Sequence, residues 1–263
     1  MSAAAAIYER ELDASTERIW ENVLDWEHLP YLHAQAFAGI RVESADAGGW
    51  KAEVELPGTP GNFATVDVRL DRPSLRYTTR TLAGSGAGTE ITTSLFPREE
   101  RRTGIRVEFH VPWAPRSAAE AIGAAYRGLY VTLWDQDEAM MRERQRVLDA
   151  AAAVSPGENE RSLVLGRVHD LASRLPLDVG LAGRRFRVVS IDGRLHAYDL
   201  RCPHLGGPLG EGTLHGCEAV CPWHGYRFDV RTGQSCDGRG LRLGAAARID
   251  VDACGGDVTL RLP

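Results

Sequence analysis

The sequence predicts two domains of different fold class, an α+β domain over residues 1–150 and a small all-β domain over residues 162–263. In the first half, strand-like segments lie between a short helical segment and a long one. The second half contains short strand-like segments, at residues 184–200, 226–233 and 256–262, and turns rich in glycine and proline. Pro156 and Gly157 follow the long helical segment as a strong stop signal, so we expect a linker over residues 151–161.

The order of elements in the first half predicts a sheet wrapped around a helix. An alternating segment at residues 7–14 predicts a strand, and a helix is expected from Ser15 or Thr16, with Ile19 on its buried face. Turn residues separate the further strand-like segments, which favours an antiparallel sheet over residues 39–45, 49–56, 63–70, 75–82, 89–96 and 104–111. The capping-box sequence "SAAE" at Ser117 predicts the start of a closing helix that runs to about residue 150. This order is typical of an α+β domain.

The composition is that of an ordinary globular protein, with 43% hydrophobic and 25% charged residues. A net charge of −5 offers no basic surface for nucleic acid or an anionic membrane, and we expect neither as a partner. We find no run of 18 apolar residues that predicts a membrane-spanning helix, and the N-terminus lacks the basic start of a signal peptide. The 5 cysteines do not suggest a disulfide framework, and their grouping with histidines indicates a metal site and a reducing, cytoplasmic location.

Two Cys–His pairs carry the strongest signal in the second half. One residue separates Cys202 from His204 and two separate Cys221 from His224, with 16 residues between the pairs. Two cysteines and two histidines also suit tetrahedral zinc, but zinc fingers normally pair Cys with Cys and His with His. Here each pair is mixed, each cysteine precedes a proline, and each pair is followed by a glycine that lets the backbone approach a cofactor. This favours a Rieske centre, in which two histidines replace two cysteines on one iron of a [2Fe–2S] cluster.

Residues 162–263 resemble a Rieske domain throughout, which implies that the two Cys–His pairs hold a [2Fe–2S] cluster. Respiratory Rieske proteins brace the two cluster loops with a disulfide, and the corresponding positions here are Gly207 and Trp223, which cannot form one. In those proteins the hydroxyl groups of a serine and a tyrosine bond the sulfurs. The serine position here is Tyr226, and the tyrosine position is Phe228, which has no hydroxyl group. Fewer hydrogen bonds to the sulfurs lower the reduction potential, so the resemblance implies a potential nearer ~−150 mV than ~+300 mV.

A second group of metal-binding residue types lies near the start of the chain, in "DWEHLPYLH" from Asp25 to His33. Asp25 and His28 are three residues apart and are expected to share a helix face. We expect Pro30 to end that helix, so that His33 leaves the helical spacing and folds back towards the same ion. Taken alone, a histidine beside a proline at a helix end is more often structural or solvated.

An acid on the closing helix would complete such a site, and Asp135, Asp137 and Glu138 are the candidates. The apolar stripe of this helix comprises Ile122, Tyr126, Tyr130, Leu133, Trp134, Met140, Met141 and Leu148. At about 100° per residue, Asp137 lies at the centre of the stripe, whereas Asp135 points to the polar face. A buried carboxylate is costly unless it is compensated, either by a metal cation or by Arg144 on the same face. We expect a metal and assign Asp137 as its ligand.

These residues resemble those of the Rieske non-haem iron oxygenases, whose first two iron ligands lie in the pattern Asn-x-x-Asp-x-x-His-x-x-x-x-His, matched here by Asn22, Asp25, His28 and His33. The resemblance implies a START/SRPBCC-like helix-grip domain in which His28, His33 and Asp137 hold a mononuclear Fe(II). Asn22 and Asp25 are then candidate catalytic residues. The domain order is reversed, because family members usually place the Rieske domain first.

The same resemblance implies a role for Asp25 between the two iron centres. In the family, the matching acid bonds a histidine of the mononuclear iron and a cluster histidine of a neighbouring subunit, which here would be His224. We therefore expect a homotrimer.

The function that the resemblance implies is that of a terminal oxygenase, a mono- or dioxygenase. The [2Fe–2S] cluster would deliver electrons to the mononuclear Fe(II), which would activate dioxygen and hydroxylate or dealkylate a small apolar or aromatic substrate. A separate reductase or ferredoxin would supply the electrons, because the chain has no glycine-rich dinucleotide motif. The alternative is an electron carrier or redox sensor, a Rieske ferredoxin-like domain fused to a START-like ligand-binding domain. The candidate wall residues of the substrate cavity are Phe63, Phe109, Trp113, Tyr126, Tyr130 and Trp134.

Overall fold

The computed structural model describes residues 4–58, 60–153, 161–244, 247–253 and 256–262. It divides into two compact units, Met1–Gln145 and Arg146–Pro263, which we describe one at a time. The predicted fold class is confirmed, because a helix-grip α+β unit precedes a small all-β unit. Residues 154–160 of the predicted linker lie outside the described residues.

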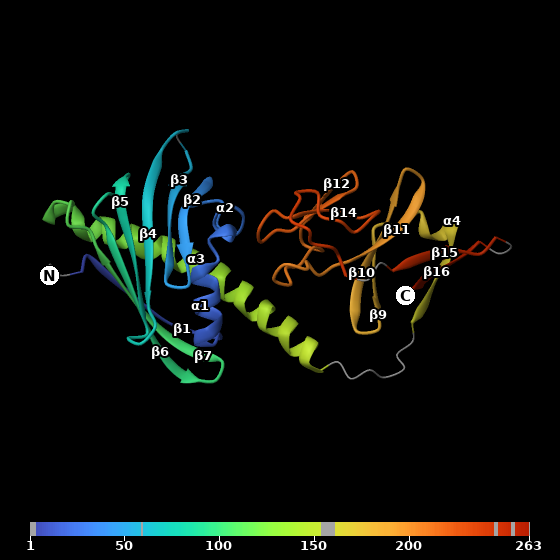
Figure 1. Ribbon diagram of the computed structural model, residues 1–263, viewed down its shortest axis with the longest axis horizontal. Helices are drawn as coiled ribbons and strands as arrows, with labels where there is room; N and C mark the ends of the chain where they lie inside the picture. Colours follow the sequence, from blue (N-terminus) through green and yellow to red (C-terminus); the bar gives the residue numbers. More distant parts are fainter. Residues whose placement is uncertain (1–3, 59, 154–160, 245–246, 254–255, 263) are drawn as a thin grey trace. The chain divides into compact units, whose positions relative to one another are not determined.

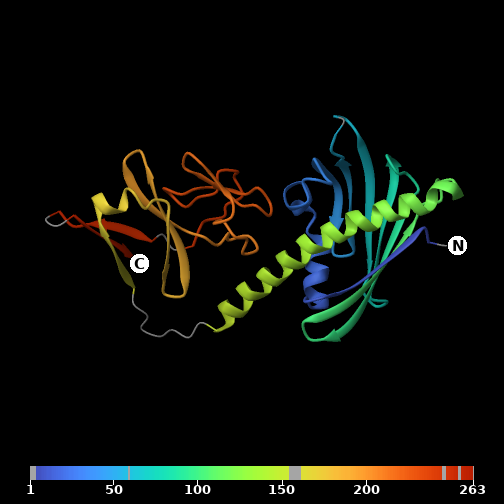
Figure 2. The ribbon, with the colours of Figure 1, turned by 180° about the vertical axis from the view of Figure 1, so that it is seen from behind.

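The first unit is a 7-stranded antiparallel sheet that curves around one long helix (Figures 1 and 2). Its strand order is β1-β7-β6-β5-β4-β3-β2, so every neighbouring pair is consecutive in sequence except β1 and β7. The strands are β1 (Ala6–Leu12), β2 (Gly39–Asp46), β3 (Gly49–Glu55), β4 (Phe63–Asp71), β5 (Arg76–Gly84), β6 (Glu90–Glu99) and β7 (Arg102–His110). Alternate residues of these strands face the helix, which gives the sheet an apolar inner side.

The helices of the first unit are α1 (Thr16–Leu24), the 3₁₀ helix η1 (Trp26–His28), α2 (Leu29–Leu32) and α3 (Arg116–Ala153). As expected, Ser15 caps α1, and its side chain accepts a hydrogen bond from the backbone N–H of Arg18 at 3.3 Å. The expected cap at Ser117 is wrong, because α3 already begins at Arg116, and α3 continues beyond residue 150. Among the described helices, none is long and apolar enough to span a membrane.

The structure corrects the expected role of Pro30. Helix α1 ends at Leu24, and Asp25 is its C-cap residue, with its N–H bonded to the carbonyls of Glu21 and Asn22. Pro30 does not end this helix but lies in the first turn of α2, where its missing N–H is tolerated. Asp25 is the N-cap residue and His28 the last residue of the 3₁₀ helix η1, so the two lie on one turn of a 3₁₀ helix and not on a continuation of α1.

The core of the first unit lies between α1, α3 and the inner face of the sheet. Its fully buried residues include Leu12, Ile19, Val107 and Phe109, and α3 contributes Trp134 and other apolar side chains. The apolar stripe predicted for α3 therefore faces the sheet, which brings Asp137 to the inside of the unit.

Two glycines of α3 test how tightly this helix packs on the sheet. A Cβ atom at Gly123 would lie 2.6 Å from the backbone oxygen of Ala5, whereas nothing lies within 4 Å of one at Gly128. We expect Gly123→Ala to lower the free energy of unfolding by about 1–3 kcal/mol through overpacking. Gly128→Ala, the matched control, should raise it by about 0.5–1 kcal/mol through helix propensity. Urea unfolding measures both, and equal effects of the same sign would contradict close packing of α3 on β1.

The second unit consists of three 3-stranded antiparallel sheets, with orders β11-β10-β9, β12-β13-β14 and β15-β16-β8. Its core includes Leu171, Phe186, Val188, Val258 and Leu260. The strands are β8 (Ser162–Arg167), β9 (Leu177–Leu181), β10 (Arg184–Ile191), β11 (Arg194–Asp199), β12 (Thr213–His215), β13 (Glu218–Val220), β14 (Arg227–Asp229), β15 (Arg248–Val251) and β16 (Asp257–Arg261), and the short helix α4 spans Val168–Leu171. The two Cys–His pairs lie in the loops that follow β11 and β13.

Candidate metal centres and cavity

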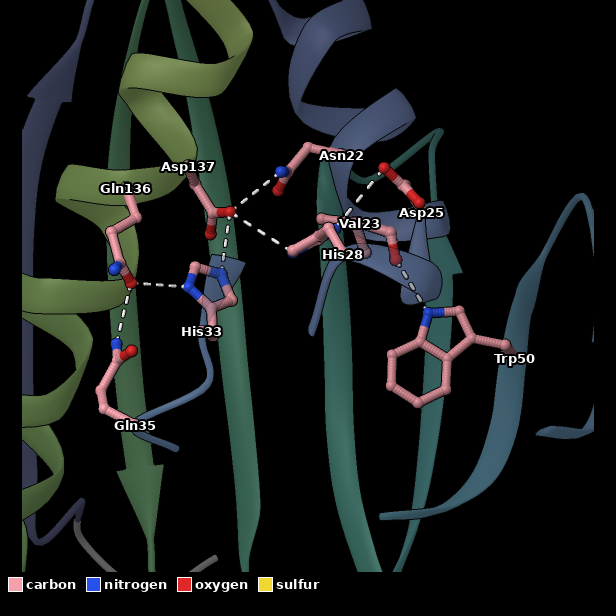
Figure 3. Close-up of polar contacts among 9 residues, drawn as sticks. All are labelled: Asn22, Val23, Asp25, His28, His33, Gln35, Trp50, Gln136 and Asp137. Atoms are coloured by element: carbon pink, nitrogen blue, oxygen red, sulfur yellow. Dashed lines mark hydrogen bonds and ion pairs between the residues drawn. The ribbon is translucent and has the colours of Figure 1, made fainter. Parts of the chain in front are cut away.

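His28, His33 and Asp137 come together inside the first unit, as the sequence predicts (Figure 3). His28 ends η1, His33 follows α2, and Asp137 lies on α3. The Nε2 atoms of His28 and His33 lie 3.5 Å and 3.0 Å from the same atom, Oδ1 of Asp137. The three potential ligand atoms lie within 4.8 Å of one another, and the residues are only 3%, 1% and 9% exposed. One ion could therefore contact all three side chains.

The other nitrogen of each ring faces an oxygen outside this group of three. Nδ1 of His33 lies 2.8 Å from Oε1 of Gln136, and Nδ1 of His28 lies 3.6 Å from Oδ2 of Asp25 (Figure 3). Metal-binding histidines usually direct their second nitrogen to a carboxylate or carbonyl oxygen, which fixes the ring. Gln136 is a functional candidate that the sequence analysis missed, and only its place next to Asp137 in the chain could have indicated it.

Asn22 and Trp50 hold the surrounding elements in position. The Asn22 amide, which is buried on α1, donates to Oδ1 of Asp137 at 3.0 Å. The Trp50 indole of β3 donates to the carbonyl of Val23 at 2.8 Å and so ties the end of α1 to the sheet (Figure 3). Asn22 and Asp25 thus contact the three clustered side chains from outside and are positioning residues by geometry.

The charges of Asp137 and His33 depend on each other. Burial is the largest influence on Asp137 and favours its neutral form, but the hydrogen bonds from His33 and Asn22 and the charges of the two histidines together outweigh burial and leave the carboxyl pKa below its usual value. Burial is likewise the largest influence on His33 and lowers its pKa, but the hydrogen bond and charge of Asp137, together with the hydrogen bond of Gln136, outweigh burial and raise the pKa. The buried carboxylate is therefore stabilised by positive charge next to it. Two imidazole nitrogens and one carboxylate are the donor set of a facial-triad Fe(II) site, so the residues fit that metal.

The other candidate partners on α3 are engaged elsewhere. Asp135 is 60% exposed and pairs with Arg10, as expected for the polar face. Arg144, which could have neutralised Asp137, instead pairs with Glu21 at 3.3 Å. The alternative of a buried Asp137–Arg144 salt bridge is therefore wrong.

A cavity of about 260 Å³ opens from the three clustered residues into the space between α3 and the sheet. Three of the six predicted wall residues line it, namely Tyr126, Tyr130 and Trp134. The other three do not. Phe109 is fully buried behind the wall, with its ring centroid 4.8 Å from that of Tyr130, and Phe63 and Trp113 are exposed. The apolar stripe of α3 therefore forms both core and cavity wall, a distinction that periodicity alone does not make.

The two loops that carry the Cys–His pairs in the second unit share one backbone pattern. The N–H of Cys202 donates to the carbonyl of Gly207, and the N–H of Gly206 donates to the carbonyl of Cys202, at 2.8 Å and 3.0 Å. Cys221 repeats the pattern with Tyr226 and Gly225, at 2.8 Å and 2.9 Å. The fifth residue of each loop has a positive φ, 87° at Gly206 and 64° at Gly225, which explains the glycine at both positions.

The four predicted cluster ligands converge between these loops. The rings of His204 and His224 lie 4.5 Å apart at 80°, and both cysteines are buried. The thiol of Cys202 donates to the sulfur of Cys221, which lowers the pKa of Cys221 to about 5 and raises that of Cys202. Two sulfurs that share one proton can both become thiolates when iron replaces the proton. Two thiolates and two imidazoles at one point fit the ligands of a Rieske cluster.

Gly207 and Trp223 face each other, as expected for the two positions that correspond to the bracing disulfide of respiratory proteins. A Cβ atom at Gly207 would lie 3.1 Å from the Trp223 ring and 2.8 Å from Sγ of Cys221. The contact is made by packing, because neither residue has a thiol.

We expect Gly207→Ala to disturb the cluster loops, because the new methyl group would press on Sγ of Cys221. The free energy of unfolding should fall by about 1–3 kcal/mol, and cluster occupancy should fall with it. Iron and sulfide per chain and the visible absorption spectrum measure this. Gly180→Ala in β9 is the control, since its Cβ atom would meet nothing closer than 3.9 Å. A variant with full cluster content would contradict the close contact.

Tyr226 packs on a cluster ligand, with its ring stacked on that of His204 at 4.5 Å and 23°. Its hydroxyl accepts a hydrogen bond from Nη1 of Arg239 at 2.7 Å, and the guanidinium carbon of Arg239 lies 4.0 Å from the ring centroid. Phe228, which occupies the position of the tyrosine in respiratory Rieske proteins, is fully buried. Arg239 could not be predicted from the sequence, because no spacing rule links it to the Cys–His pairs.

Comparison with known protein families identifies the second unit. Residues 161–242 match the model of the Rieske [2Fe-2S] domain. The human apoptosis-inducing factor 3 is 38% identical over 74 residues, 28% of this chain and 12% of that protein. A human Rieske domain-containing protein is 31% identical over 91 residues, 33% of this chain and 58% of that protein. The oxygenase component of 3-ketosteroid-9-alpha-monooxygenase from Mycolicibacterium smegmatis is 35% identical over 65 residues, 24% of this chain and 17% of that protein.

Solved structures are also similar to part of this chain. The Zhui aromatase/cyclase from Streptomyces sp. R1128 has a TM-score of 0.44 and 14% sequence identity, and the match covers 54% of this chain and 96% of that chain. The curated relatives are matched over only part of their length, 12% and 58% for the two human proteins. Residues 161–242 of this chain are a Rieske [2Fe-2S] domain, and the two Cys–His pairs that the sequence predicts as cluster ligands lie within this segment.

Proposed function

We propose that this protein is a Rieske-type oxygenase that oxidises a small organic molecule in the cavity of its first unit. The observation that carries the proposal is the buried group of His28, His33 and Asp137 at the end of an apolar cavity, in a chain that also contains a Rieske domain. The partial similarity to the oxygenase component of 3-ketosteroid-9-alpha-monooxygenase supports it. We further propose that the subunits form a homotrimer.

The residues of the site in the first unit have separate roles in this proposal. The Nε2 atoms of His28 and His33 and the carboxylate of Asp137 would hold a mononuclear Fe(II). When bound, the Fe(II) supplies open positions for dioxygen, and the [2Fe–2S] cluster supplies single electrons. Gln136 would orient His33, and Asp25 would orient His28. The apolar walls would hold the substrate and keep bulk water away.

The reaction needs electrons from a second protein. Hydroxylation breaks a C–H bond, inserts one oxygen atom of dioxygen and releases the other as water, which consumes two electrons and two protons. We propose a separate reductase or ferredoxin as the electron source, because the sequence contains no glycine-rich dinucleotide motif.

Metal analysis and oxygen uptake test this function in the purified full chain. The oxygenase should contain about three irons per chain, two in the cluster and one at the His–His–Asp site, and should have a Rieske absorption spectrum. Chemically reduced protein should consume dioxygen faster when small neutral aromatic compounds are added. If iron is found only in the cluster, and added Fe(II) does not produce substrate-stimulated dioxygen uptake, the protein would be an electron carrier and not an oxygenase. A colourless zinc protein would overturn both.

A further inference from the structure

The lining of the cavity extends along α3 and β5, and its two ends differ in chemistry. Along α3, the lining residues run from Asp137 to Tyr126, which are about 16 Å apart at the rise of a helix. Along β5, the lining residues Tyr77, Thr79 and Thr81 follow at alternate positions. Tyr77 lies beside Trp20 of α1, with ring centroids 6.3 Å apart, and α1 also carries Asn22, which bonds Asp137. The Tyr126 hydroxyl, by contrast, lies near Gly86, just beyond the end of β5. Strand and helix therefore define the same long axis.

The volume of the cavity limits the size of a ligand. An apolar cavity of about 150 Å³ holds one benzene molecule. At about 260 Å³, this cavity has room for a molecule of roughly two small rings.

The charged and ionisable side chains of the lining, apart from its tyrosines, gather at one end, and they are Asp25, His28, His33 and Asp137. Among the described residues that line the rest of the cavity, none carries a charge. Burial raises the pKa of Tyr130, so this phenol stays neutral at physiological pH. A charged group of a ligand would lose its hydration there without gaining an ionic partner, which is costly.

Three hydroxyl groups lie in this uncharged part, on Thr79, Thr81 and Tyr126. Within the described residues, no side-chain hydrogen bond involves any of them. Ser85, at the exposed end of the lining, is different, because its hydroxyl donates to Asn62 at 2.6 Å. The three hydroxyls can therefore donate to or accept from a ligand without breaking a bond within the protein.

We infer that the substrate is an uncharged, elongated molecule of about two rings, with a hydroxyl or carbonyl group held by Thr79, Thr81 and Tyr126. This inference rests on the proposed function, in which the opposite end of the molecule lies at the His–His–Asp site and is oxidised. The oxidised carbon and the polar group are then towards opposite ends of the substrate, because Thr81 and Tyr126 lie towards the end of the cavity away from Asp137, and Thr79 lies between Thr81 and Tyr77 on β5.

Calorimetric titration of the anaerobic full chain with three compounds of equal ring size tests the inference. The compounds are indane, with no polar group, 5-indanol, with a neutral one, and indane-5-carboxylate, with a charged one. We expect 5-indanol to bind at least about tenfold more tightly than the carboxylate. The double variant Thr79→Val/Thr81→Val should weaken 5-indanol binding about five- to tenfold and leave indane within about twofold, because only hydrogen bonds are lost.

Thr78→Val is the matched control, since Thr78 lies on the same strand but faces the other side of the sheet. It should change none of the three affinities. Equal binding of 5-indanol and the carboxylate would overturn the inference, and so would a double variant that weakens all three compounds equally or none. Binding can be measured without turnover. If the expected affinities are found but no oxygen uptake is stimulated, the inferred ligand class is supported and only the oxygenase function is contradicted.

Discussion

Asp137→Asn should remove the mononuclear iron and abolish substrate-stimulated oxygen uptake, while the Rieske cluster stays bound. The carboxylate is the only charged donor in the group of three, and its oxygen lies within 3.5 Å of both histidine Nε2 atoms. Loss of an outer partner of a metal ligand already costs about 10–100-fold in metal affinity, so loss of the ligand itself should cost more than ~100-fold. Iron per chain and the rate of oxygen uptake measure both effects.

Asparagine is the suitable replacement because it keeps the size of the side chain and can still accept the hydrogen bond from Asn22. Asp135→Asn is the matched control, because Asp135 lies two residues earlier on α3 and on its exposed face. It should keep its iron. An Asp137→Asn protein with full mononuclear iron and full activity would show that the site is not built on this carboxylate.

The ligand residues could be predicted because each follows a short rule of sequence. The Cys–His pairs are defined by spacing, and the structure explains it, since Gly206 and Gly225 occupy the same position of two equivalent turns. Asp137 follows from helical periodicity, because a carboxylate on an apolar stripe needs a compensating charge. The seven strands follow from alternation and turn residues.

Positions fixed by contacts between distant segments could not be predicted in this way. Gln136 bonds His33 across 103 residues of sequence, and Arg239 reaches Tyr226 through a loop that has no characteristic pattern. The predicted role of Pro30 was wrong because proline occurs both after the end of a helix and in its first turn. Only the structure, in which α1 is already capped at Asp25, shows that Pro30 belongs to the start of α2. The division of aromatic residues between core and cavity depends on how far α3 stands from the sheet, which no local pattern encodes.

Asp25→Asn is expected to slow turnover by more than ~100-fold while both the cluster and the mononuclear iron stay bound. Asp25 is not part of the group of three, so its loss removes no direct ligand. Its carboxylate lies 3.6 Å from Nδ1 of His28 and is only 10% exposed, so it can orient the ring. We propose, as the resemblance to the oxygenase family implies, that Asp25 also joins this histidine to a cluster histidine of a neighbouring subunit and so lies on the path of the electron.

A single-turnover experiment separates these roles. The cluster is reduced with dithionite, the excess is removed, and reoxidation is followed by absorbance after 5-indanol and dioxygen are added. In Asp25→Asn, the cluster should be reduced normally but stay reduced, because its electron no longer reaches the mononuclear iron. Glu17→Gln, an exposed acid at the start of α1, should behave like the unaltered protein. Normal reoxidation with slow product formation would restrict Asp25 to orienting His28, and full activity would remove it from the mechanism.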